Sequence, residues 1–134
     1  MEAAHGGEVV MDLPADMDPE CVPLCKAINS IPGLETTCSC CGHGESSFDI
    51  WFWAKTVRSL YVLARAIDRR YGGPEEWCCL VEDMDLVDKP VVFRLTSGES
   101  RGPEAYARAS IIVASIFEAL NHPVVMKEFV NRDD

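Results

Sequence analysis

The chain has 134 residues, 48% of them hydrophobic, and 12 Lys and Arg against 22 Asp and Glu give a formal net charge of −10. A chain of this length buries roughly two thirds of its unfolded surface, so one domain can form a core without disulfides. The acidic charge argues against bulk nucleic acid as a partner, because Lys and Arg supply most phosphate contacts. No apolar run reaches the ~18 residues of a membrane span and no signal peptide is recognisable, which predicts a cytoplasmic protein without a membrane segment.

The first part of the chain differs in charge from the rest. The first twenty residues contain six Asp and Glu and no Lys or Arg. Gly6, Gly7 and Pro14 interrupt any regular period there. We therefore expect a flexible acidic leader at 1–17 and a single domain at 18–134.

A helix is expected over 19–30, since Asp18 and Pro19 are typical of an N-cap and a first helical position. A short strand follows at 34–38, then a loop with two glycines, and residues 48–53 have the composition of a strand. Strands at 77–81 and 91–95 read as buried. A long helix at 103–120 precedes a last strand or helical turn at 124–131.

Hydrophobic periodicity assigns the core-facing residues of two helices. The helix expected over 55–71 has one apolar face, made of Val57, Leu60, Tyr61, Ala64, Ile67 and Tyr71. The helix at 103–120 presents Tyr106, Ala109, Val113, Ile116, Phe117 and Leu120. The order of elements is α-β-β-α-β-β-α, which predicts an α+β domain with a mainly antiparallel sheet and about three helices packed on it.

Four of the seven cysteines read as core residues. Cys21 and Cys25 share a helical face with apolar neighbours, and free cysteine is among the most buried residue types. Cys78 and Cys79 are adjacent in an expected strand, so their side chains point to opposite faces. Such a pair cannot easily bind one metal ion together.

The other three cysteines lie between residues 36 and 45, with three hydroxyls, one imidazole and two glycines. Small polar side chains offer little apolar area, whereas glycines permit backbone turns that aim N–H groups at an anion or a carbonyl. A glycine-rich tight turn with incidental cysteines is the simplest interpretation. Three functional interpretations compete with it.

The first is a zinc site made of Cys38, Cys40, Cys41 and His43, although four ligands in six residues do not match the usual paired spacing. On this ground the sequence favours no metal. The second is nucleophilic catalysis, with Cys40 or Cys41 as the thiolate and His43 as its base or cationic partner. The third is a binding loop for a small anionic or nucleotide-like ligand.

We favour the third interpretation, with the ligand on residues 37–45. Thr37 and Ser39 would donate hydrogen bonds, and Gly42 and Gly44 would allow close approach of the backbone. Cys40 and His43 remain the candidates for catalysis, so both a binding protein and an enzyme fit these residues. Trp51, in the strand that follows, would stack on a flat ligand ring.

The stretch from Asp18-Pro19 through Pro32-Gly33 to Thr36-Thr37-x-Ser39-Cys40-x-Gly42 resembles the opening of the wybutosine-synthesis methyltransferases (TYW3-like). This resemblance implies an S-adenosylmethionine-dependent enzyme acting on a tRNA base, with functional weight on Ser39, Cys40 and Gly42. His43 departs from that family, which has Arg there. The loop is also similar to small prokaryotic and phage proteins that carry Ser-Cys-Cys-Gly-His-Gly followed by Ile-Trp-Phe, and these bring no activity with them.

The functional alternatives are therefore a small-molecule or nucleotide binder, a methyltransferase-like enzyme that uses S-adenosylmethionine, and a zinc-stabilised interaction module. Ile111 lies on the otherwise polar face of the long helix, which suggests a homodimer contact.

Overall fold

The computed structural model describes residues 17–83 and 91–131, so the expected leader lies outside the described residues apart from Met17. The helices are α1 (Val22–Asn29), α2 (Tyr61–Ile67), α3 (Gly102–Leu120) and α4 (Pro123–Asn131). Short 3₁₀ turns are η1 (Pro19–Cys21), η2 (Gly42–Gly44), η3 (Val57–Leu60) and η4 (Arg69–Tyr71). The strands are β1 (Leu34–Cys40), β2 (Ser47–Ala54), β3 (Cys78–Asp83) and β4 (Val91–Arg101).

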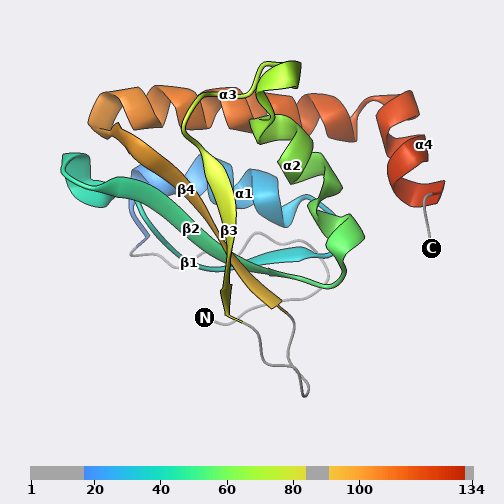
Figure 1. The fold of residues 1–134 in the computed structure, drawn as a ribbon, viewed down its shortest axis with the longest axis horizontal. Helices are drawn as coiled ribbons and strands as arrows, with labels where there is room; N and C mark the ends of the chain where they lie inside the picture. Colours follow the sequence, from blue (N-terminus) through green and yellow to red (C-terminus); the bar gives the residue numbers. More distant parts are fainter. Residues whose placement is uncertain (1–16, 84–90, 132–134) are drawn as a thin grey trace.

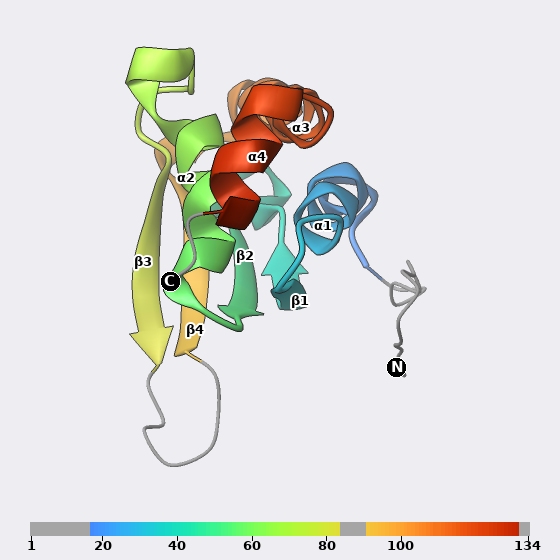
Figure 2. The same ribbon diagram turned by 90° about the vertical axis from the view of Figure 1, so that its right-hand side faces the viewer.

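One four-stranded sheet, in the order β1-β2-β4-β3, forms the base of the molecule, and each neighbouring pair is antiparallel. The described helices all lie on one side of this sheet (Figures 1 and 2). The predicted α+β class is confirmed. None of the helices in the described ranges is long and apolar enough to cross a membrane.

Alternation along β2 separates the two faces of the sheet. Phe48, Ile50 and Phe52 are fully buried beneath the helices, whereas Trp51 and Trp53 are half-buried on the opposite side. No helix in the described part of the chain lies on that opposite side, which we call the uncovered face (Figure 2). The hydrophobic core is therefore a single layer between the sheet and α1, α2 and α3.

The apolar face expected for the helix over 55–71 is only partly right: Leu60 and Ile67 pack against the core, whereas the other four residues are exposed. Val57 is 83% exposed, Tyr71 55% and Tyr61 36%, and the buried side chains are instead Val62, Leu63 and Ala66. The segment begins with the 3₁₀ turn η3, where the side chain of Thr56 accepts a hydrogen bond from the backbone N–H of Ser59. Three residues per turn replace 3.6 there, so a helical period counted from Val57 falls on the wrong face.

Several other boundaries and exposures also differ from the expectation. β1 continues to Cys40, so only residues 41–46 form the connection to β2. β3 is an edge strand, with Leu80 40% and Val81 59% exposed, and Cys78 is exposed rather than part of the core. The long helix is confirmed, although Phe117 is 39% exposed, and residues 123–131 form α4. Ile111 is 45% exposed, and the homodimer contact stays a prediction.

The one-sided core predicts a difference between two adjacent aromatic residues of β2. Phe52→Ala removes a side chain with no exposed surface and should lower the free energy of unfolding by about 3–5 kcal/mol. Trp53→Ala acts on the uncovered face and should cost roughly half as much or less, although its side chain is larger. Urea unfolding followed by circular dichroism measures both. Equal losses would contradict a core on one face only.

Candidate functional site

Asp18 connects the start of the helical region to the end of β1. The sequence predicts an N-cap at this position, but the Asp18 side chain makes no capping hydrogen bond to η1. Its Oδ2 atom instead accepts a hydrogen bond from the backbone N–H of Cys41 at 3.2 Å. This hydrogen bond is the main cause that holds the pKa of Asp18 below its ordinary value. The carboxylate is therefore ionised at neutral pH.

The other end of α1 is held against the same strand. The Asn29 side chain accepts from the backbone N–H of Thr36 at 2.9 Å and donates to the Thr36 hydroxyl at 3.0 Å. β1 is thus attached near its beginning to Asn29, the last residue of α1, and the residue that follows β1 is attached to Asp18, which precedes η1. These two attachments set the position of the turn that follows.

The turn after β1 uses three consecutive residues with positive φ. Gly42 and Gly44 have φ values of 81° and 83°, and His43 between them has a φ of 52°. A side chain in this left-handed region costs on the order of 1 kcal/mol, so the imidazole is presented at the expense of backbone strain. Gly42 is also required sterically, because a Cβ atom there would lie 2.6 Å from the backbone oxygen of Ser47.

Backbone N–H groups in this turn donate to sulfur. The N–H of Gly42 donates to Sγ of Cys40 at 3.4 Å, and the N–H of His43 donates to Sγ of Cys41 at 3.3 Å. The sequence assigns such groups to an anionic ligand, but these two already serve the cysteines. The backbone of the turn thus orients both sulfur atoms.

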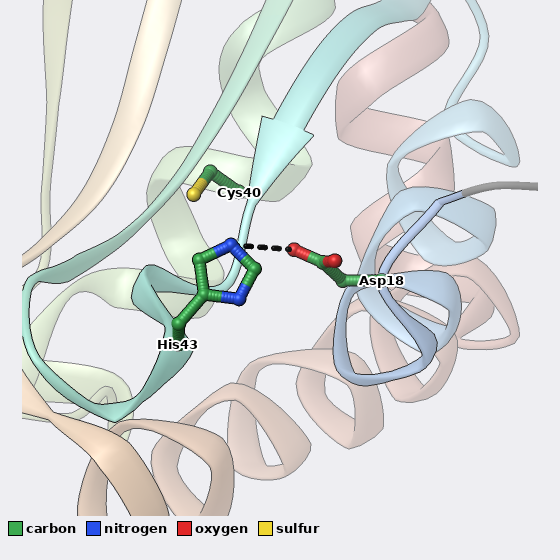
Figure 3. Close-up of side chains that lie close together, drawn as sticks. All are labelled: Asp18, Cys40 and His43. Atoms are coloured by element: carbon green, nitrogen blue, oxygen red, sulfur yellow. Dashed lines mark ion pairs between the residues drawn. The ribbon is translucent and has the colours of Figure 1, made fainter.

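Three side chains converge at the end of β1: Asp18, Cys40 and His43 (Figure 3). One carboxylate oxygen, one thiol sulfur and one imidazole nitrogen lie within 4.8 Å of one another. Nε2 of His43 is 3.8 Å from Oδ2 of Asp18, and the His43 side chain is 70% exposed against 28% for Asp18. We call these three residues the donor group.

Cys41 faces the interior instead of solvent. Its side chain is 3% exposed, and burial raises the pKa of its thiol. Nδ1 of His43 lies 3.9 Å from its sulfur. A hydrogen bond with the Cys41 thiol is also the main cause that raises the pKa of Tyr106 to about 12. Cys41 thus anchors the turn on the core and is not exposed for chemistry.

The remaining predicted residues are dispersed around the donor group. Ser39 points toward α1 and hydrogen-bonds the thiols of Cys21 and Cys25, whose burial raises their pKa values to about 12 and about 11. Thr37 is exposed and donates to the backbone oxygen of Trp51 at 3.2 Å. Cys38 is exposed but does not belong to the donor group.

The structure thus brings Cys40 and His43 together, as the sequence suggests, and adds Asp18. The sequence does not predict Asp18 as a site residue, because an aspartate before a proline is typical of a helix start. It lies 23 residues from Cys41, to which it bonds. The six acids among the first twenty residues are the sequence signal that draws attention to this segment.

The lowered pKa of Asp18 predicts a pH-dependent contribution to stability. The folded-state pKa lies below the ordinary value of 3.8, so this group stabilises the fold above that pH and stops doing so as the pH falls through the folded pKa. Asp18→Asn should therefore lower the melting temperature more at pH 7 than at pH ~2. Thermal unfolding at both pH values measures this, with Glu20→Gln as a control from the same turn. An equal decrease at both pH values would contradict the prediction.

Backbone strain at His43 predicts different stabilities for two substitutions that both remove the imidazole. His43→Gly relieves the left-handed strain, so its free energy of unfolding should be about 1 kcal/mol higher than that of His43→Ala, which keeps the strain. Urea unfolding in buffer containing a chelator measures the difference. If His43→Gly is the less stable of the two variants, the prediction of backbone strain at residue 43 is wrong.

Comparisons with models of protein families, with curated proteins and with solved structures give no match to this chain. The donor group is the functional candidate that the described residues offer. Its atoms are an ionised carboxylate, a hydrogen-bonded thiol and an exposed imidazole, drawn from two segments that only the fold brings together.

Proposed function

We propose that this chain is a small-ligand-binding protein whose site is a single transition-metal ion of the zinc type, held by Asp18, Cys40 and His43. The observation that carries the proposal is the approach of three different donor atoms within 4.8 Å. The ligand then occupies the remaining coordination position, beside residues 37–45. In this proposal the ligand binds beside the segment that the sequence favours. The positive charge that attracts the ligand comes from the metal ion.

The chemistry of the three donors supports zinc. Thiolate sulfur, imidazole nitrogen and carboxylate oxygen are the three ligand types that Zn²⁺ uses in proteins, whereas Mg²⁺ and Ca²⁺ prefer oxygen alone. Three protein ligands with one open position are typical of zinc sites that bind an exogenous molecule, and closed structural sites have four. The donor set therefore favours a binding role over a purely structural one.

The surroundings of the donors match the needs of a metal site. Metal–ligand distances of about 2.0–2.3 Å place tetrahedral ligand atoms roughly 3.5 Å apart, so atoms within 4.8 Å need only a small side-chain rotation. His43 has the exposed surface for that movement. The backbone N–H groups of Cys41 and Gly42 hold Asp18 and Cys40 in place, as outer-shell partners do in metal sites.

Charge supports the same proposal. Without a metal ion, the donor group contains a carboxylate and lies in a chain of net charge −10. These negative charges repel a free anion. A divalent cation is attracted instead. Once bound by one carboxylate and one thiolate, its charge is balanced, so the open position accepts a neutral or singly charged donor. The nucleotide-like ligand and the methyltransferase alternative stay predictions of the sequence.

Metal titration tests this function. Chelator-treated protein should bind one Co²⁺ per chain, with a thiolate charge-transfer band and visible bands of a four-coordinate site, and Zn²⁺ should displace the Co²⁺. Cys40→Ser, Asp18→Asn and His43→Ala should each weaken binding by more than about 100-fold, because loss of an outer-shell partner alone costs about 10–100-fold.

Cys38→Ser is the matched control for Cys40→Ser. Both thiols lie on β1 two residues apart, but only Cys40 belongs to the donor group. Cys38→Ser should leave the Co²⁺ affinity and spectrum unchanged. Absence of a thiolate charge-transfer band in the wild type, or equal losses in the two serine variants, would refute the proposed site.

A further inference from the structure

The uncovered face of the sheet continues directly from the donor group. Strand pairing places Cys40 opposite Asp49, and Cys38 opposite Trp51. On the other side of β2, Trp51 pairs with Arg94 and Trp53 pairs with Val92. Trp51 is therefore the diagonal cross-strand neighbour of Cys40 on the same face. Diagonal neighbours lie about 7–8 Å apart, within reach of an aromatic side chain.

Trp51 occupies an unusual position for so large an apolar side chain. It lies on β2, a central strand, yet it is only half-buried, because no helix of the described chain covers this face. The guanidinium carbon of Arg94 lies 6.0 Å from the centre of its ring. An indole held on a rigid central strand is preorganised for stacking on a flat molecule.

The charges on this face exclude a strongly anionic occupant. Arg94 is held by two carboxylates: its Nε atom lies 3.0 Å from Glu82, and Nη1 lies 3.4 Å from Asp49. Its positive charge is thus already balanced, and Glu35 adds an exposed acid opposite Trp53. Phosphate groups would meet more negative than positive charge here. A neutral ring is the occupant that this face accepts.

We infer that the ligand of the proposed metal site is a neutral heteroaromatic molecule, of the free-base or nucleoside class and without phosphates, whose ring nitrogen binds the metal while a fused ring stacks on Trp51. This inference rests on the proposed function, since the metal supplies the anchor. It assigns a specificity role to Trp51: the donor atom fixes one end of the ligand, and the indole selects for a second ring.

Imidazole and benzimidazole test this role, because both offer the same kind of ring nitrogen and only benzimidazole has a fused ring. Each is titrated into the Co²⁺-loaded protein and followed by the visible bands of the metal. Trp51→Ala should reduce the affinity for benzimidazole relative to imidazole by about tenfold, the loss typical of one stacking partner. The affinity for imidazole itself should stay within about twofold of the wild type.

Trp53→Ala is the matched control, since it removes the next indole on the same face, which lies two residues further along β2 than Trp51 from the position opposite Cys40. Its preference for benzimidazole should remain that of the wild type. Trp51→Leu keeps an apolar side chain without a flat ring and replaces Trp51→Ala if that variant does not fold. The Co²⁺ spectrum without probe reports that the metal site is intact in each variant.

The outcomes distinguish the two proposals. A wild-type protein that shows no Co²⁺ site refutes the proposed function and this inference with it. An intact Co²⁺ site whose preference for benzimidazole is unchanged by Trp51→Ala, or is reduced equally by Trp53→Ala, overturns this inference alone. Tighter binding of adenosine monophosphate than of adenosine to the Co²⁺-loaded protein would also overturn it, because the face would then favour a phosphate.

Discussion

The hydrogen bond from the Cys41 backbone to the Asp18 carboxylate is the contact on which the site depends. It joins the first turn of the helical layer to the last residues of β1, and it keeps the carboxylate charged by lowering its pKa. The Asn29–Thr36 hydrogen bonds secure the opposite end of α1 to the same strand. With both ends held, the turn at 42–44 has one position relative to Asp18, and the imidazole reaches the carboxylate from a strained backbone.

Burial divides the cysteines near this site into two kinds. Cys21 and Cys25 lie fully within the core, where desolvation raises their pKa values far above neutrality, and Cys41 is nearly as buried. Thiols in such surroundings remain protonated and act as small apolar side chains. Cys40 is partly exposed, accepts a backbone hydrogen bond and faces two other donors. Cys40 is therefore the thiol of this segment that lies with two other donor atoms, while Cys41 packs into the core.

The two faces of the sheet have different roles for a related reason. Three helices supply the apolar surface that one face needs, and the fully buried residues of β2 pack against them. The opposite face presents two half-buried indoles and a guanidinium whose charge is balanced by two carboxylates. Cys40 lies at the rim of this face, so a metal ion at the proposed site would lie close to both the solvent and an aromatic surface.

Local patterns in the sequence determined the α+β class, the strand at β2 and the long helix α3, because alternation and helical period are properties of neighbouring residues. They also identified Cys40 and His43 through the density of thiols, imidazole and glycines. Tertiary structure decided which side of α2 is buried, since the 3₁₀ turn η3 shifts the period, and it decided which face of β2 remains uncovered. It alone brought Asp18 to Cys40 and His43, because that approach depends on packing α1 against β1, a contact between segments that no local pattern records.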